Sequence, residues 1–318
     1  YIHIRDKEWK TLGISVGVIA ICLGLIFLTK LSWWELNQSY LKETMRGGHS
    51  ELTKQAQDKP AEGLDIKYAT DWSYGKGETM TLLIPNWEGG ASGYDLGKDS
   101  PLSQAMRKQE VAKRDAEQFC AHAPTYHGEK AFTSGAVYVG AIVCFLFLLG
   151  LFIVPGPYKW ALFFATLMSI FLAWGRNMMW LTELFFKYFP VYNKFRAVES
   201  ILIVAEITMP LLAMLAVKQW LEGTDADKKR HLIALGIAGG ITAGLCLFLA
   251  LFGGSIINFT SSYDSQWKGQ VGNDIYRMII DQRAAMMRAD AWRSLLFIVL
   301  TAALLLWYRY KPFKKMYL

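Results

Sequence analysis

Cations and aromatic rings are mixed in residues 176–200, the stretch whose residue types point most directly to chemistry. The cations include Arg176, Lys194 and Arg196, and the rings include Tyr192. Aromatic rings of this kind prefer the depth of lipid headgroups, where long cationic side chains reach phosphate groups. We therefore expect this stretch to lie at a membrane–water interface, with its cations close to phosphate.

A proline divides the same stretch. Pro190 cannot continue a helix, so a helix over residues 178–189 should end before it. We expect that helix to lie in the plane of the membrane. A turn at residues 190–193 and a new membrane helix from about residue 199 should follow, which puts Arg196 at the mouth of that helix, just under the aqueous surface.

Aromatic residues among glycines form a second candidate group. Trp72, Tyr74 and Trp87 fall within residues 65–95, where glycines punctuate a short apolar run. Rings in this setting suit stacking on sugars. Ordinary packing inside a loop explains the same residues and is the more common case.

One acid, Glu206, lies well inside an apolar run. A carboxylate in hydrocarbon is costly, which makes it a functional candidate. Pro210, four residues on, would free the Glu206 carbonyl oxygen from its helical hydrogen bond. An acid that stays protonated, or that bonds to a neighbouring helix, is the equally open structural alternative.

The histidines show no metal-ligand spacing, and His122 and His127, five residues apart, do not share a helical face. His49 and His231 stand far from both. We find no nucleotide or hydrolase motif, and the four cysteines form no disulfide or metal pattern. The sequence identifies no cofactor and no metal site, although it leaves a divalent metal possible.

Long apolar runs must position these residues. Hydrophobic residues make up 53% of the chain, and they concentrate in runs of roughly 17–25 residues, the length that crosses a bilayer. This predicts an all-α polytopic membrane protein with about six transmembrane helices. They are expected at residues 11–29, 134–154, 160–175, 200–217, 232–253 and 294–308.

The cations give the orientation. The net charge is +7, but Lys and Arg cluster in short segments beside the apolar runs, which argues against a nucleic-acid partner and for membrane lipids. If six spans alternate, these segments fall on one side, which should be cytoplasmic, with both chain ends there.

The expected regions follow from this orientation. They are residues 1–33 (cytoplasmic lead and first helix), 34–133 (extracytoplasmic), 134–253 (helices two to five, with the interfacial segment 176–199), 254–292 (second extracytoplasmic loop) and 293–318 (sixth helix and basic cytoplasmic end).

Two helices are expected outside the spans. Residues 100–120 suit a solvated helix that Ser100 caps and Pro101 begins. Residues 274–293 suit an amphipathic helix. That helix could lie on the membrane or pack under the large loop, and the pattern leaves both open.

Several segments together resemble one family. They read KETMRGG, DWSYGKGETMTLLIPNWEGG, LAWGRNMMWLTELFF and YFPVYNKFRAVESIL. The chain resembles YfhO-like membrane proteins over about residues 36–309, and these are similar to the GT-C superfamily of polytopic glycosyltransferases. The YNKFRA segment and the upstream GRN are the most specific parts of the resemblance.

The resemblance implies an enzyme of the bacterial cytoplasmic membrane. Such enzymes transfer a sugar from a polyprenyl-phosphate donor to a glycan or lipid of the cell envelope, outside the membrane. The resemblance places donor-phosphate binding on Arg196, with Arg176 and Lys194 as partners, because Arg stays charged and forms forked hydrogen bonds. Rings such as Tyr192 could hold the prenyl chain, and Trp72 could stack on sugar.

The catalytic residue is not assigned by the resemblance. Similar families use an acid on the first outer loop, and we expect this chain to be an internal portion that begins after it. An ion pair between Arg196 and Glu199 that only fixes a helix start is the structural alternative for Arg196. A transporter or flippase of lipid-linked precursors, dependent on Glu206, is the functional alternative, and a non-catalytic scaffold is a third.

Overall fold

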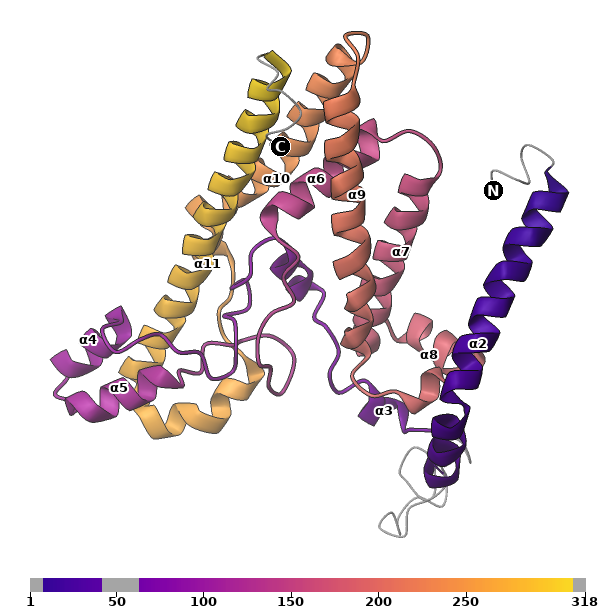
Figure 1. Ribbon diagram of the computed structural model, residues 1–318. Coiled ribbons are helices and arrows are strands. Elements are labelled where there is room, and N and C mark those ends of the chain that lie inside the picture. The colour runs from indigo at the N-terminus through magenta and orange to yellow at the C-terminus, as the bar shows by residue number, and fades with distance from the viewer. Residues whose placement is uncertain (1–7, 42–62, 311–318) are drawn as a thin grey trace. The chain divides into compact units, whose positions relative to one another are not determined.

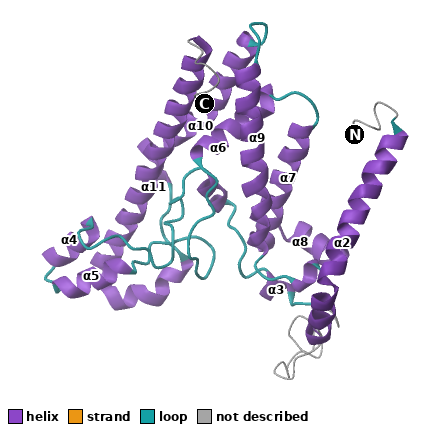
Figure 2. Ribbon diagram, in the orientation of Figure 1, coloured by secondary structure: helices purple, strands orange, loops and turns teal. Residues whose placement is uncertain are grey.

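The computed structural model describes residues 8–41 and 63–310, which are helical and loop segments with no named strand (Figure 2). A single antiparallel bridge joins Tyr94 and Ala123. The described residues form two units. One contains the residues up to 68 together with 189–195, and the other contains the remainder. The KETMRGG segment and His49 lie outside the described residues.

The first unit consists mainly of α2 (Trp9–Leu41), with most of α3 (Ile66–Ala69) and the turn η4 (Tyr192–Lys194). α2 is apolar on all its faces over its first half, as a membrane helix is. It continues well past the end that the apolar run predicted. The backbone N–H of Leu64 donates to the carbonyl oxygen of Asn193 at 2.9 Å, which ties the turn to residues 63–64.

The second unit is a bundle of helices joined by loops (Figure 1). α10 packs against α11 and α6, and α9 packs against α6 and α7. These helices are α6 (Ala141–Ile153), α7 (Tyr158–Ala173), α9 (Ile203–Glu222), α10 (Lys228–Ile256) and α11 (Ser265–Tyr310).

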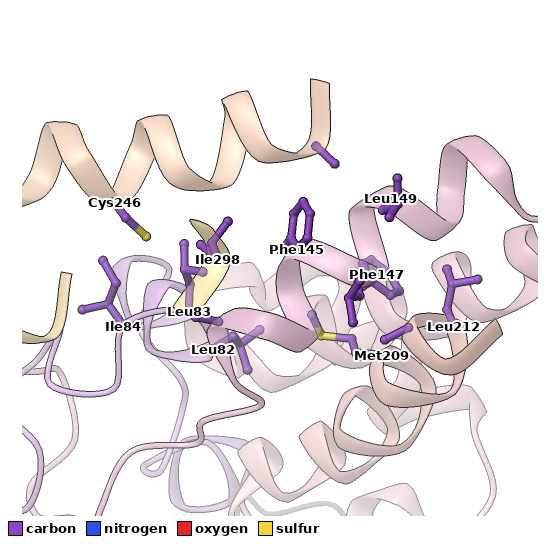
Figure 3. Close-up of a cluster of buried hydrophobic side chains, with 14 of the residues drawn as sticks. Leu82, Leu83, Ile84, Phe145, Phe147, Leu149, Met209, Leu212, Cys246 and Ile298 are labelled. Carbon is purple, nitrogen blue, oxygen red and sulfur yellow. The ribbon is translucent and has the colours of Figure 1, made fainter. Parts of the chain in front are cut away.

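The core of the bundle includes part of a loop. Leu82 and Ile84 enter the same buried cluster as Phe145, Leu212 and Ile298, which come from α6, α9 and α11 (Figure 3). The loop that holds Leu82 is therefore anchored by the hydrophobic effect and not only by hydrogen bonds.

Four of the described helical segments are long and apolar enough to cross a membrane: Trp9–Trp33, Val198–Glu222, Lys228–Ile256 and Val271–Tyr310. A fifth exists if α7 and the bent helix after it count as one span, and α6 is a shorter apolar helix. The prediction of a multi-span helical membrane protein is thus supported, with four or five candidate spans against the six expected.

The second expected span begins later than predicted. Residues 134–140 are not helical, and α6 starts at Ala141. Gly140 has a φ of 115°, and its N–H donates to the carbonyl oxygen of Leu82 at 3.2 Å. An apolar run cannot signal this, because non-helical residues that pack partly against protein, as Val137 and Val139 do, can have the same composition as a helix.

Residues 100–120 form two helices, α4 (Pro101–Lys108) and α5 (Lys113–Ala121), where one was predicted. The expected cap is confirmed, since the Ser103 N–H donates to Ser100 Oγ at 3.2 Å. Glu110, with a φ of 63°, lies in the break. One face is buried instead of solvated. It contributes Leu102, Met106, Ala116 and Cys120 to a cluster with Ile279 of α11.

The amphipathic segment at residues 274–293 follows a kink at Gly272 and belongs to a long helix that continues into the last apolar run. Its Ile279 is buried beneath α4 and α5. Of the two alternatives for this segment, packing under the large loop is therefore the one that the structure supports. Residues 254–292 are mostly helical, apart from a connection that contains η6 (Ser262–Asp264).

The interfacial segment has the predicted break. η3 (Gly175–Met178) follows α7 and leads into α8 (Met179–Tyr188), and the two helices form an angle of 111°. α8 ends before Pro190, as expected. η5 (Val198–Leu202) then leads into α9.

Candidate functional site

The two predicted phosphate-binding arginines both contact one dipeptide, Trp72–Ser73. The guanidinium carbon of Arg196 is 4.3 Å from the centroid of the Trp72 ring, a cation–π contact. The backbone N–H of Arg176 donates to Ser73 Oγ at 2.9 Å. Both arginines are exposed. Phe132 meets the Trp72 ring edge to face at 5.1 Å.

A glycine makes this arrangement possible. Gly175 has a φ of 46°, and a Cβ there would come within 2.3 Å of Ser73 Oγ and 2.6 Å of a methyl group of Val198. Only a residue without a side chain fits so close an approach. The end of α7, the loop at Ser73 and the start of η5 meet at this point.

Glu129 is hydrogen-bonded to both Arg176 and Asn177. The Nη2 of Arg176 donates to the carbonyl oxygen of Glu129 at 2.6 Å, and Asn177 Nδ2 donates to Glu129 Oε2 at 2.7 Å. Asn177 also bonds to the carbonyl oxygen of Tyr74 at 3.0 Å. The Glu129 side chain is therefore exposed, but Asn177 holds its carboxylate in place, while Arg176 holds its backbone.

Lys130 is buried and joins distant segments. Its Nζ is 2.7 Å from Glu199 Oε2 in η5 and 3.3 Å from Glu78 Oε1 in η2 (Gly77–Leu82). It also lies over the rings of Tyr74 and Tyr126, at 5.5 and 5.9 Å from their centroids. One cation thus pairs with two carboxylates that are far apart in the sequence.

Glu78 is held by further donors. The Gly75 N–H donates to Oε2 at 2.8 Å, and the Tyr126 hydroxyl donates to Oε1 at 3.0 Å. Burial raises the pKa of Glu78 in spite of these donors and of Lys130. Burial also raises the pKa of the Tyr126 hydroxyl, with the negative charge of Glu78 adding to the effect.

Glu88 and His127 form a second buried pair, with Glu88 Oε2 and His127 Nε2 3.4 Å apart. Burial raises the pKa of Glu88 to about 8, and the charges of Glu78 and Glu129 add to the shift. Burial lowers the pKa of His127 to about 4, helped by Arg283. The pair is therefore neutral near pH 7, with the proton on Glu88.

Arg283 binds the backbone that leads to His127. It is fully buried, its Nη2 lies 2.8 Å from Asp264 Oδ1, and it donates to the carbonyl oxygens of Pro124 and Tyr126. Burial opposes ionisation of Asp264, but hydrogen bonds from Arg283 and the backbone outweigh it and lower the Asp264 pKa. This pair fixes α11 against residues 124–127.

The remaining predicted residues lie apart from this cluster or inside the core. Tyr74 is buried, and its hydroxyl bonds to the Glu78 carbonyl oxygen and to Thr81. This fits ordinary packing inside a loop, the alternative to sugar stacking. Trp87 is half-buried against the core. Glu206 is exposed in the first turn of α9.

The two predicted residues of the first unit are Lys194 and Tyr192. Both are half-buried in η4. Burial raises the pKa of the Tyr192 hydroxyl.

Sequence reasoning missed the carboxylates and Lys130. Glu78 and Glu88 are acids among glycines in a segment that otherwise runs apolar, a signal that could have been used. Glu129 and Lys130 carry no such signal, since their partners lie 48 to 69 residues away.

In residues 8–41 and 63–310, no group of three or more His, Cys, Asp or Glu side chains is arranged to hold a metal ion. Comparison of the chain with protein-family models, with curated proteins and with solved structures gives no match.

Proposed function

We propose that the chain is a YfhO-like membrane glycosyltransferase of the GT-C type. It would transfer a sugar from a polyprenyl-phosphate donor to a glycan or lipid at the outer side of the bacterial cytoplasmic membrane. The observation that carries the proposal is that Arg196 and Arg176 both contact the dipeptide Trp72–Ser73, while Asn177, the neighbour of Arg176, fixes the carboxylate of Glu129.

The chemistry needs a cation and a base. The acceptor hydroxyl attacks the anomeric carbon, the bond from that carbon to the phosphate oxygen breaks, and polyprenyl phosphate leaves with a second negative charge. The guanidinium groups of Arg176 and Arg196 would stabilise that charge. The acceptor proton would pass to an exposed carboxylate, for which Glu129 is the best-placed candidate in the described part of the chain.

The proposed topology has six spans with both ends cytoplasmic. Counting α6 and the bent α7–α8 pair as spans gives this number. α6 covers about 20 Å at 1.5 Å per residue, and the non-helical residues 134–140 would complete the crossing, with Val137 and Val139 packed partly against the core. The loops at residues 34–133 and 254–292 then face outward.

Sugar release tests the proposal. Membranes that contain the full-length protein are incubated with a radiolabelled polyprenyl-phosphate sugar, and Arg196→Ala and Arg176→Ala are compared with the wild type at equal expression. Lys187→Ala, an exposed cation of the same segment, is the control. We expect at least tenfold slower release for each arginine variant, which corresponds to about 1.4 kcal/mol of transition-state stabilisation, and no change for the control.

Transport of a lipid-linked precursor is the second candidate, and the break of 111° between α7 and α8 favours it, since transporters use broken helices. Unchanged sugar release in both arginine variants would contradict the donor-phosphate site. Labelled lipid that crosses the bilayer without sugar release would favour the transporter instead.

A further inference from the structure

A groove lies beside the cytoplasmic end that the cation pattern predicts, away from the polar cluster described above. It has a volume of about 470 Å³ and runs along the start of α10 beside the end of α6. The residues that line it are Phe152, Ala226, Lys229, Arg230, Ile233, Ala234 and Ile237.

The lining changes character along α10. Lys229 and Arg230 lie in its first turn, and Ile233 and Ile237 follow at helical spacing on the same side. Both isoleucines are about half exposed. The groove thus offers charge at one end and hydrocarbon at the other, which matches a molecule with an anionic head and an alkyl chain.

The charge at this end is not balanced. The first turn of α10 contains Lys228, Lys229 and Arg230 and no acid, although the positive end of a helix dipole disfavours cations there. In the part of the chain that the structure describes, no carboxylate pairs with Lys229 or Arg230. The nearby Asp227 accepts hydrogen bonds from Thr224.

The cations are also held in place at the groove. Arg230 Nη2 donates to the Phe152 carbonyl oxygen at 2.8 Å, and Lys159 Nζ donates to the Leu151 carbonyl oxygen at 2.8 Å. Each of these bonds uses one N–H group of its side chain. The other N–H groups of Arg230 remain available for an anion, and a guanidinium suits phosphate well.

We propose that this groove binds an anionic phospholipid, with the headgroup phosphate on Lys229 and Arg230 and an acyl chain along Ile233 and Ile237. The site is separate from the proposed donor site and does not depend on it. Its assignment to the cytoplasmic leaflet rests on the proposed topology.

Lipid binding to the purified full chain tests this site. Phosphatidylglycerol is titrated against the protein and binding is read by native mass spectrometry, with phosphatidylcholine as the neutral lipid. We expect Lys229→Gln to weaken phosphatidylglycerol binding about fivefold, and the double variant Lys229→Gln/Arg230→Gln more strongly, at the usual strength of a basic residue for anionic lipid. Lys218→Gln, an exposed cation on α9, should have no effect.

The Lys229 side chain is exposed and makes no hydrogen bond within residues 8–41 and 63–310, so Lys229→Gln still tests the site if the double variant unfolds. Equal binding of phosphatidylglycerol by Lys229→Gln and the wild type would overturn the proposal. Displacement of the lipid by millimolar inorganic phosphate would overturn the lipid assignment in favour of a soluble anion. Equal affinity for phosphatidylcholine would overturn the proposal that the groove selects an anionic headgroup.

Discussion

Burial, more than any hydrogen-bond partner, keeps the proton on Glu88. The carboxyl group lies against the neutral imidazole of His127, and its neighbours Glu78 and Glu129 are also acids. A buried carboxyl group that keeps its proton near pH 7 can donate a hydrogen bond or a proton, which is a property that active sites use. Its proton also makes folding depend on pH.

Stability should therefore fall as pH rises from about 4.5 to about 8. In that window the unfolded chain has released the Glu88 proton while the folded chain still holds it. Glu88→Gln removes this loss. We expect the variant to gain about 2–4 kcal/mol relative to the wild type across the window, a range reduced for partial exposure of the side chain.

Unfolding in denaturant at several pH values, with the two proteins compared at each, measures this difference. His127 acts in the opposite sense, because its lowered pKa makes stability rise with pH between about 4 and 6.5. That contribution is present in both proteins, so it largely cancels in the comparison. A difference that stays constant with pH would contradict a buried, protonated Glu88.

Lys130 gives a second residue-scale prediction. Lys130→Met leaves Glu78 and Glu199 buried or half-buried without their cation. Removal of one partner from a buried pair costs about 3–5 kcal/mol. Thermal or denaturant unfolding of the purified protein measures the loss.

Lys113→Met is the matched control, since Lys113 pairs with Glu117 at an exposed position, where such pairs contribute less than about 1 kcal/mol. Adding Glu78→Gln and Glu199→Gln to Lys130→Met should recover part of the stability. Equal losses for Lys130→Met and Lys113→Met would mean that the buried cation has no special role.

The sequence pointed to part of this site and could not have given the rest. Arg176 and Arg196 stand in a stretch whose composition is typical of an interface, and the structure brings them to the same dipeptide. Lys130 pairs with Glu78 and Glu199, which are far from it in the chain. Such pairs depend on how distant loops pack together. The spacing of residues along the chain therefore does not predict them.

At the scale of elements, the close approach of α6 and α9 holds the bundle together. Gly150 faces α9 so closely that a Cβ would lie 2.9 Å from Leu212 Cγ and 3.0 Å from the Leu212 carbonyl oxygen. One of these atoms is backbone, which cannot move aside without shifting the helix. Small residues at helix interfaces allow such contacts in membranes.

Gly150→Ala should therefore destabilise the protein by about 1–3 kcal/mol, the usual cost of overpacking. Gly236→Ala is the control, because a Cβ at this position of α10 meets nothing within 4 Å. It should be neutral or stabilising by up to about 1 kcal/mol, from helix propensity. The temperature of unfolding in detergent distinguishes the two, and a similar response of both would argue against close packing of α6 on α9.

The predictability of the elements follows the same logic. The runs at residues 200–217 and 232–253 correspond to α9, which begins three residues later and ends five residues later than predicted, and to α10, which is longer at both ends, since an unbroken apolar helix has a clear signal. α11 was harder, because its first part buries Ile279 under α4 and α5 while its polar residues resemble a surface helix. Periodicity reports one apolar face and does not say whether lipid or protein covers it.

At the scale of the molecule, α9 separates two polar ends of the bundle. The chain enters it from η5, where Glu199 meets Lys130, and leaves it toward the connection before α10. α9 has 20 residues, which corresponds to about 30 Å, the thickness of the hydrocarbon. Under the proposed topology, we expect the candidate site and the groove beside α10 to lie at opposite faces of the membrane.

Surface labelling of single cysteines tests that arrangement. The four native cysteines are first replaced, and Lys98→Cys and Asp225→Cys are then introduced one at a time, both at exposed loop positions. We expect a membrane-impermeant maleimide to label Lys98→Cys on intact cells and Asp225→Cys only after permeabilisation, because the cations of the α9–α10 connection should be retained in the cytoplasm. The reverse pattern would invert the topology and put the candidate site inside the cell, where an outward-facing transfer reaction could not use it. Labelling of both positions on intact cells would mean that α9 does not separate them across the membrane.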